Sequence, residues 1–421
     1  MIALIEEVSS TSVPVVILQS APSLQHGSLG IARTAGRLGI QVYWVHGQAW
    51  APATLSRYVQ GTFHWNASAS VEASVAYLQE CSRKIGRKPI LVPTDDVAAV
   101  FVADQADALR KCFLFPDQPA GLARTLSNKK EMHFLCKKVG VPMPEAAFPQ
   151  SVAEAAAFAK TLGFPVVMKR IAGWLPEPRP RMKSVTIVSS PEELLEEYGE
   201  GGTPGEPNIM LQEYIPGGPE DVWMFNGFFT NSSECLFGCT GKKIRQAPPL
   251  TGATTLGICL KNETVEQMAM RFLGKIGYSG IVDMDYRYDR RDGQYKLLDV
   301  NPRVGATFRL FVDSNGMDVM RALYLDLTGQ PVKRGAACEG RKWIVEQSDL
   351  MTSIRYTRLG KLTPTEWARS LRRIEEGAWF APDDLLPFAA MCWGSLVKAG
   401  RELGDWIRAA AWYASRSRLC E

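Results

Sequence analysis

The sequence predicts an α/β protein with three parts: a small parallel α/β domain, a larger region of strands and helices, and a mainly helical C-terminal extension. Between residues 13 and 46 a strand, a helix and a second strand follow one another, which is typical of a parallel sheet. In the middle of the chain, alternating strands lead to a hairpin, which is typical of antiparallel pairing. From about Gly329 onward, helical patterns dominate.

The composition is that of a folded chain. Its 421 residues are 46% apolar and 22% charged, which excludes a disordered protein and allows two or three domains. The formal net charge is +4, and the excess lies wholly in residues 331–421, which hold 15 Lys and Arg against 11 Asp and Glu. This bias is too small for the dense basic face of a nucleic-acid binder, so we expect no nucleic-acid partner.

Three features predict a cytoplasmic protein. Nine cysteines are scattered without a C-x-x-C pair or a histidine cluster, so we expect reduced thiols rather than disulfides or a zinc site. Met1–Ser12 carries Glu6 and Glu7 where a secretory signal would be basic. The apolar run Leu385–Val397 has only about 13 residues, too few to cross a bilayer.

The first domain, residues 1–120, contains three predicted strands: Val13–Leu18, Ile40–Val45 and Ile90–Pro93. We expect Ser20–Gly30 to be a loop, with His26, Gly27, Ser28 and Gly30 placing backbone amides toward an anion before the first helix. The spacing G-x-G-x-x-G of dinucleotide sites is absent. Thr94, Asp95 and Asp96 follow the third strand, where they either contact a ligand at the sheet edge or cap a helix.

Residues 121–330 form the predicted central domain, with a small lobe at about 121–212 and a large lobe at about 213–330. A Pro, Gly and Asp-rich stretch at 116–121 precedes it. Its predicted helices are 127–139, 153–162, 191–198 and 263–276. Its predicted strands are 164–169, 184–188, 209–215, 222–230, 234–240, 255–260, 281–288 and 294–300, the last two joined as a hairpin by the turn 289–293.

The hairpin carries the most informative polar residues. Its first strand holds Asp283 and Asp285 on one face. Its second strand holds Asp299 and Asn301 on one face, and Arg303 follows two residues later. Carboxylate and amide oxygens suit a hard cation such as Mg²⁺, which binds together with substrate phosphates. The alternative is a solvent-facing strand pair with ordinary surface acids, although aspartate is a poor strand residue.

Two lysines and one further strand extend this candidate site. Lys169 ends an apolar strand, where a phosphate would supply its counter-charge; the alternative is a lysine that reaches along the surface to solvent. Lys129 begins a helix and, taken alone, is an ordinary surface lysine. The strand 209–215 runs into a Pro-Gly turn, so its backbone can hydrogen-bond a purine edge while Glu220 reaches a ribose.

The order of these elements resembles the ATP-grasp superfamily over roughly residues 13–330: a helical lysine, a strand lysine, Gln212-Glu213-Tyr214-Ile215, and a hairpin ending in Asp299-Val-Asn-Pro-Arg303. Within that superfamily the sequence is similar to carboxylate–amine ligases of the D-aspartate ligase type and to the ATP-binding modules of the carbamoyl phosphate synthase large chain. The resemblance implies an ATP-grasp fold, in which two α+β lobes enclose ATP.

The resemblance also implies a role for each residue. The nucleotide phosphates would be contacted by Lys129 and Lys169, with Lys169 also near the adenine. The adenine pocket would be lined by Gln212, Glu213, Tyr214 and Ile215, and the ribose bound by Glu220. Two Mg²⁺ ions, replaceable by Mn²⁺, would be held by Asp285, Asp299 and Asn301. Arg303 would face the transferred phosphate, Arg245 would meet the substrate carboxylate or the γ-phosphate, and residues 251–255 would cradle the acid.

Two positions depart from the pattern of the superfamily. Asp299 stands where relatives usually have Glu, and its shorter side chain changes the metal geometry. Many relatives have a glycine-rich lid after the second lysine, whereas residues 172–183 hold three prolines and one glycine. Arg179, Arg181 and Lys183 in this loop would bind phosphate by charge, or the loop would order only when substrate arrives.

The implied function is that of an ADP-forming, C–N bond-forming ligase, which activates a small-molecule carboxylate as an acyl phosphate and joins it to an amine. Two alternatives remain: an ATP-grasp enzyme with a thiol or bicarbonate co-substrate, and a non-catalytic ATP-binding scaffold. The identity of the acid and the amine cannot be predicted from the sequence.

The extension 331–421 holds six of the eleven tryptophans together with the basic excess. We favour a helical cap on the ATP-binding core. Alternatives are an interface with a second subunit, contact with an amphiphilic substrate, or a helix on an anionic membrane surface. The last rests on a predicted helix from Leu385 onward, which carries Lys398, Arg401, Trp406, Arg408, Trp412, Arg416 and Arg418.

Overall fold

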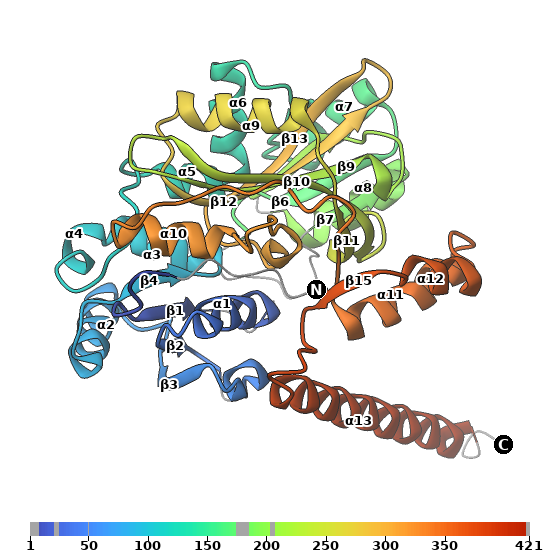
Figure 1. Cartoon of the computed structure of the whole chain (residues 1–421). Helices are drawn as coiled ribbons and strands as arrows, with labels where there is room; N and C mark the ends of the chain where they lie inside the picture. The colour runs from blue at the N-terminus through green and yellow to red at the C-terminus, as the bar shows by residue number, and fades with distance from the viewer. Residues whose placement is uncertain (1–7, 21–24, 49, 174–184, 203–206, 418–421) are drawn as a thin grey trace.

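The computed structural model describes residues 8–20, 25–48, 50–173, 185–202 and 207–417, with backbone alone for 402–417. Three sheets organise these residues, and Figure 1 shows the first sheet below the other two, with a long helix projecting at the C-terminal end. The eight cysteines in the described part form no disulfide.

The N-terminal sheet is parallel, with strand order β3-β2-β1-β4. Its strands are β1 (Val15–Gln19), β2 (Val42–His46), β3 (Val59–His64) and β4 (Ile90–Pro93). Its helices are α1 (Gln25–Arg37), α2 (Val71–Ile85), α3 (Asp96–Asp104) and α4 (Ala106–Leu109), and a short helix η1 spans Pro52–Leu55. The predicted parallel unit is therefore confirmed.

The predicted anion-facing loop at Ser20–Gly30 is wrong over the part that the structure describes. Helix α1 begins at Gln25, so the glycines at 27 and 30 lie inside it. They permit close packing: a Cβ atom at Gly27 would lie 2.8 Å from the Ala306 Cα atom, and one at Gly30 would lie 2.9 Å from Phe308. The glycines therefore serve packing of the N-terminal domain on the large sheet.

The second sheet belongs to the small lobe and has the order β5-β8-β6-β7. Its strands are β5 (Ala146–Ala147), β6 (Val166–Arg170), β7 (Val185–Val188) and β8 (Ile209–Glu213), and helices α5 (Leu122–Ser127), α6 (Lys129–Val139), α7 (Val152–Leu162) and α8 (Pro191–Gly201) accompany it. Helices α7 and α8 cover one face through a core that includes Ala155, Leu194, Met168 and Leu211. The period-2 alternation then leaves Val167 and Lys169 on the other face.

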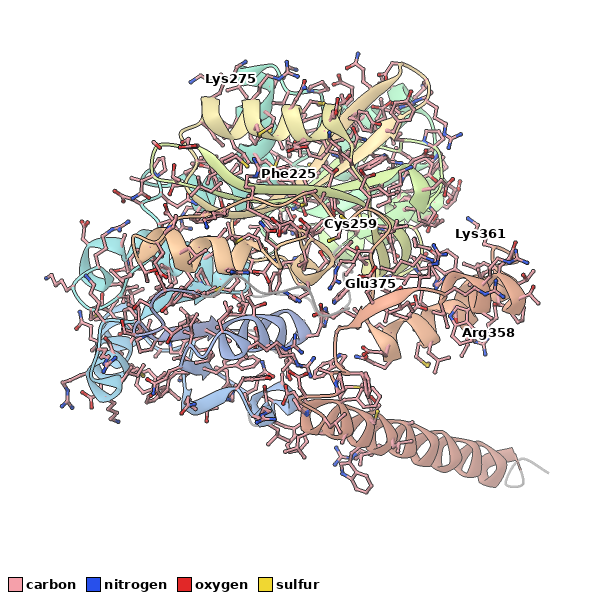
Figure 2. The ribbon with its side chains drawn as sticks, in the orientation of Figure 1. Phe225, Cys259, Lys275, Arg358, Lys361 and Glu375 are labelled. Atoms are coloured by element: carbon pink, nitrogen blue, oxygen red, sulfur yellow. The ribbon has the colours of Figure 1, made fainter. Side chains whose placement is uncertain are left out.

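The third sheet has seven strands in the order β13-β12-β9-β10-β11-β14-β15. Its strands are β9 (Val222–Phe229), β10 (Cys235–Ala247), β11 (Ala253–Cys259), β12 (Gly280–Asp289), β13 (Gln294–Asn301), β14 (Lys342–Ile344) and β15 (Ile374–Gly377). Helices α5, α6 and α9 (Glu263–Lys275) pack on one face, where Phe225 is buried (Figure 2). On the other face, α10 (Val319–Leu327) and α1 share a core with Phe228 and Phe308. The N-terminal domain is thus fixed against the large sheet.

The C-terminal extension is not solely helical. Strands β14 and β15, of three and four residues, extend the large sheet beyond β11. Helices α11 (Glu346–Arg358), α12 (Pro364–Ser370) and α13 (Leu386–Ser417) follow, which confirms the predicted helix from Leu385 onward. None of the described helices combines the length and apolar character needed to cross a bilayer.

A buried ion pair fastens the extension to the N-terminal domain. The Arg33 guanidinium on α1 donates to Asp384 Oδ2 at 3.0 Å and to the Trp379 carbonyl at 2.7 Å, and both ionised side chains are nearly inaccessible to solvent. The Ser56 hydroxyl donates to the same carboxylate at 2.7 Å. Because these groups satisfy one another away from water, the segment before α13 is held firmly on the N-terminal domain.

Candidate nucleotide and metal site

A cleft of about 780 Å³ lies between the small-lobe sheet and the seven-stranded sheet. Strands β6, β7 and β8 form one wall, and β10, β12 and β13 form the other. Apolar side chains on the small-lobe wall, Val167, Val185 and Ile187, face polar and charged side chains on the opposite wall, among them Lys243, Asp285 and Asp299. A cleft with an apolar side and a charged side suits a ligand that has a flat base and phosphates.

The cap of helix α6 positions Lys129 at the cleft. The Asn128 side chain accepts hydrogen bonds from the amides of residues 130 and 131, at 3.0 and 3.1 Å, and so begins the helix. The Lys129 amide donates to the Ile171 carbonyl at 2.8 Å, which joins the helix to the end of β6. The Lys129 ammonium then forms an ion pair with Asp299.

Lys169 reaches the same cleft from β6. Among the described residues it forms no ion pair, and burial lowers its pKa to about 8, although the Asp299 carboxylate acts in the opposite direction. A buried ammonium without a bonded counter-ion is satisfied by an anion that enters the cleft. The sequence-based role of Lys129 and Lys169 as phosphate ligands therefore has a geometric basis.

The hairpin β12–β13 brings the predicted metal ligands opposite one another. Asp285 pairs in register with Asp299, and Asp283 pairs with Asn301. The Lys243 ammonium on β10 lies 2.7 Å from Asp285 Oδ2. Burial alone would raise the pKa of Asp299, but the Lys129 ammonium holds it below its ordinary value. Both hairpin carboxylates in the cleft are thus paired with lysines.

Asp283 lies beside these carboxylates in a more enclosed position. The Asn226 amide on β9 donates to Asp283 Oδ1 at 3.4 Å. A Cβ atom at Gly305 would lie 2.5 Å from the Asp283 carboxyl carbon, so only glycine fits there. Burial, with the nearby Asp285 charge, raises the pKa of Asp283 to about 6. Asp283 therefore takes up a proton in a weakly acidic solution.

Arg303 connects this cluster to the N-terminal domain. Its guanidinium donates to Asp96 Oδ1 at 2.6 Å and to Asn301 Oδ1 at 3.2 Å. Burial alone would lower the pKa of Arg303, but the Asp96 charge raises it. Asp96 is the first residue of α3, and Asp95 is its cap, accepting from the Ala98 amide at 2.9 Å. Two roles were predicted for this acidic turn, ligand contact and helix capping, and Asp95 caps the helix. Asp96 instead orients Arg303 through its hydrogen bond.

Strand β8 supplies the predicted adenine segment. Gln212, Glu213, Tyr214 and Ile215 all line the cleft. The Glu213 carboxylate is already bound by Arg291 at 2.6 Å, which leaves backbone groups to contact a ligand. The Gln212 side-chain nitrogen is buried without a hydrogen-bond partner in the part of the chain that the structure describes. A purine in this cleft would satisfy that donor.

Four predicted residues lie outside the cleft lining: Glu220, Arg245, Asn301 and Arg303. Arg303 lines a separate pocket together with residues of the N-terminal domain. Glu220 and Arg245 instead line a neighbouring groove of about 1180 Å³, which shares Leu250 with the cleft. The Arg245 guanidinium is 2% exposed and donates to both carboxylate oxygens of Asp349, at 2.8 and 2.7 Å. The structure thus brings together Lys129, Lys169, the segment 212–215, Asp285 and Asp299 in the cleft lining, whereas the roles assigned to Glu220, Arg245, Asn301 and Arg303 stay predictions.

The structure adds cleft residues that the sequence reasoning missed. Lys243, Gln246 and Arg287 line the cleft, and the buried Nε atom of Arg287 has no hydrogen-bond partner among the described groups. A β-bulge in β10 separates Lys243 from Arg245, because the register with β11 shifts on both sides of Arg245. The bulge turns Lys243 into the cleft and Arg245 away from it. The sequence Lys243-Ile-Arg245 shows that a second cation lies near Arg245. It does not reveal the bulge, which decides which of the two side chains enters the cleft.

The hairpin offers carboxylate and amide oxygens as candidate ligands for Mg²⁺. No group of three or more His, Cys, Asp or Glu side chains in the described chain is placed to hold a metal ion. Mg²⁺ commonly binds through one or two carboxylates together with waters and substrate phosphates. Asp285, Asp299 and Asn301 fit that mode. The predicted loop cations Arg179, Arg181 and Lys183 lie outside the described residues.

No protein-family model matches the sequence. The chain is 24% identical over 261 residues to a D-aspartate ligase of Enterococcus faecium (strain Aus0004), a match that covers 60% of this chain and 61% of the ligase. It is 24% identical over 203 residues to the N-terminal section of a carbamoyl phosphate synthase large chain of Methanopyrus kandleri, covering 46% of this chain and 34% of that protein. The chain thus spans less than two thirds of either relative.

Solved structures resemble the whole arrangement. An L-amino acid ligase from Bacillus licheniformis matches with a TM-score of 0.56 and 17% identity, covering 76% of this chain and 75% of that one. The biotin carboxylase domain dimer of a Hydrogenobacter thermophilus 2-oxoglutarate carboxylase, in complex with MgADP, ADP and bicarbonate, matches with a TM-score of 0.57 and 16% identity, covering 78% of this chain and 73% of that one. At these identities the likeness concerns the fold.

Proposed function

This chain has the fold of the ATP-grasp superfamily, as its sequence predicted, and on that premise we propose that it is an ADP-forming ligase that joins a small carboxylate to an amine. One observation carries the proposal: Asp285 and Asp299 face one another across β12–β13, and three lysines, at 129, 169 and 243, share their cleft. Ordinary surface acids would not share a cleft with three ammonium groups, two of which pair with them directly. A site built of paired carboxylates and cations suits a nucleotide polyphosphate with its metal.

Each cleft residue has a part in this proposal. The apolar wall of Val167, Val185 and Ile187 would hold the base, and Gln212 would donate to it. Lys129, Lys169 and Lys243 would bind the phosphates. Asp285, Asp299 and Asn301 would hold Mg²⁺, which when bound neutralises phosphate charge and favours in-line displacement. Lys129 and Lys243, which pair with Asp299 and Asp285 in this structure, would contact the nucleotide when these carboxylates serve as metal ligands.

The proposed reaction has two steps. A carboxylate oxygen attacks the γ-phosphorus, the bond from that phosphorus to the bridging oxygen breaks, and ADP leaves with the electron pair. The amine then attacks the carbonyl carbon of the acyl phosphate, inorganic phosphate departs, and the nitrogen loses a proton. Arg303, held by Asp96 and Asn301, would stabilise the charge on the transferred phosphoryl group. Exclusion of water would protect the acyl phosphate from hydrolysis.

The second candidate function is a reaction that uses bicarbonate as the acid. It is favoured by the similarity to a biotin carboxylase domain crystallised with bicarbonate. Two observations favour an amino-acid-type substrate instead, namely the similarity to a D-aspartate ligase in sequence and to an L-amino acid ligase in structure. A thiol acceptor and a non-catalytic scaffold remain as further outcomes of the test.

The experiment is a screen for ADP release. Purified protein with ATP and Mg²⁺ is incubated with carboxylic acids and amines, singly and in pairs, and ADP is followed by a coupled enzyme assay. We expect ADP release only when an acid and an amine are both present. Release with bicarbonate and no other acid would support the second candidate, and nucleotide binding without ADP release in any mixture would support a scaffold. The Asp107→Asn variant, which alters an exposed aspartate remote from the cleft lining, is the control for cleft substitutions.

A further inference from the structure

Large apolar side chains are exposed mainly on one part of the molecule. Nine lie between residues 350 and 396, whereas six lie in all the rest of the described chain. The nine are Leu350, Met351, Ile354, Leu359, Phe380, Leu385, Leu386, Trp393 and Leu396. Such a concentration is rare on the surface of a monomeric protein and marks a place of interaction.

Helix α11 is amphipathic in the opposite sense to an ordinary surface helix. It buries polar residues, among them Asp349 and Thr352, against the large sheet. It exposes Leu350, Met351 and Ile354, with Met351 59% exposed. Because burial of apolar residues is what normally holds a surface helix, this orientation leaves an apolar face available to a partner.

Helix α13 also turns apolar residues outward. Met391 on its inner side is buried, and Phe388 packs on Phe380 with ring centroids 5.5 Å apart. On the outer side Trp393 is 66% and Leu396 is 67% exposed. Figure 1 shows α11, α12 and α13 on the same side of the molecule, with α13 extending beyond the domain on which it begins.

The charges of this region are divided between its inner and outer sides. Three of its acids are used inward: Asp349 binds Arg245, Glu376 binds Arg309, and Asp384 binds Arg33. Glu366 and Glu375 are exposed and are outnumbered by the outer cations of the region. Its outer cations, Arg355, Arg358, Lys361, Arg369, Arg372 and Arg373, are exposed and form no ion pair with any described residue. Figure 2 shows Arg358 and Lys361 at the outer end of this region. The outer side is therefore both apolar and positively charged.

We propose that this surface, made of the nine apolar and six basic side chains named above, binds the surface of an anionic lipid bilayer. Exposed apolar side chains enter the boundary between headgroups and acyl chains, and flanking cations contact the phosphates. A second copy of the chain is disfavoured, because a two-fold interface would place the same positively charged patch against itself. A nucleic acid would engage the cations but would leave Leu350, Met351 and Ile354 exposed to water.

The test is co-sedimentation of the full chain with vesicles. We expect binding to vesicles of phosphatidylcholine and phosphatidylserine in a ratio of about 3:1, weak binding to phosphatidylcholine alone, and loss of binding at high salt. Trp393→Ser with Leu396→Ser should lower the partition coefficient at least about tenfold. Arg358→Glu with Lys361→Glu should lower it at least about twenty-fold, because each lost cation weakens binding about fivefold and the new charges repel the lipid. Leu195→Ser, which changes an exposed leucine on α8, is the control and should bind as the parent chain does.

Several results would overturn the proposal. One is equal recovery of the protein with and without anionic vesicles, and another is unchanged binding by both double variants. A third is a dimer in sedimentation velocity that the same variants dissociate, without any vesicle binding, which would make the surface an interface between copies. Nucleotide affinity, measured on every variant, separates loss of lipid binding from loss of fold, because none of the substituted side chains lines the cleft.

Discussion

The ion pair between Arg245 and Asp349 distinguishes a structural role from a catalytic one. Both side chains are almost fully buried, with 3% and 1% of their surface exposed, and two hydrogen bonds join them. Asp349 also accepts hydrogen bonds from the Thr255 hydroxyl at 3.0 Å and the Trp367 indole at 3.1 Å. Replacement of Asp349 by leucine therefore leaves a buried guanidinium and two neutral donors without this acceptor.

The expected change in the free energy of unfolding is obtained by treating the buried charge of Arg245 separately from the two neutral donors. An uncompensated buried charge costs about 3–5 kcal/mol, whereas replacing both partners by apolar residues removes that cost. The two neutral donors lose their acceptor equally in Asp349→Leu and in the double variant Arg245→Met with Asp349→Leu. We therefore expect the double variant to exceed Asp349→Leu in free energy of unfolding by about 3 kcal/mol or more. The exposed pair Arg110–Asp117 is the control, and its coupling should be below about 1 kcal/mol.

The assay is urea denaturation followed by tryptophan fluorescence, combined with turnover of the substrate pair found by the ADP screen. Equal stability of the single and double variants would refute the reasoning, because the guanidinium would then not depend on Asp349. Turnover decides whether Arg245 also contacts the substrate. If the folded double variant binds nucleotide normally but loses more than about 100-fold in kcat/KM, Arg245 contacts the substrate, as the superfamily resemblance implies.

Three further predictions concern the cleft and the fastening of the extension. Because burial lowers the pKa of Lys169 to about 8, the lysine is charged below that pH; calorimetry should show ADP affinity falling toward tenfold per pH unit well above 8, and Lys169→Arg, which stays charged, should lack this slope. Asp299→Asn should lower turnover at least about 100-fold with an unchanged circular dichroism spectrum, and normal turnover would show the metal assignment to be wrong. Arg33→Met leaves the Asp384 carboxylate buried, so urea denaturation should show a loss of about 3–5 kcal/mol; an unaltered transition would contradict the buried-pair argument.

The central hairpin could be predicted because its signals are local. Alternation with period 2 and a turn containing Gly293 specify two antiparallel strands, and the observed register places Asp285 opposite Asp299. The same holds for the helix that begins at Lys129, where Asn128 is a good capping residue. Local sequence therefore predicted both the strands and the side chains that they carry to the cleft.

Other features depend on contacts that no local pattern reveals. The bulge in β10 places Lys243 in the cleft and Arg245 outside it, because one extra residue in a strand changes which side chains share a face. Strand β14 has three residues, too few for periodicity, and forms only because β11 offers an edge. The partner of Arg303 is Asp96, 207 residues earlier in the chain, so its orientation could not be predicted from its neighbours.

The buried ion pair between Arg33 and Asp384 has a consequence for biosynthesis. The two residues are separated by 351 positions, so a ribosome that has just completed the N-terminal sheet has not yet made the anion that helix α1 needs. At about 5–20 residues per second, synthesis of the chain from Arg33 to Asp384 takes on the order of 20–70 s. Until then the guanidinium stays hydrated and the face of α1 that will receive residues 378–384 stays open, so a segment made late in synthesis covers it.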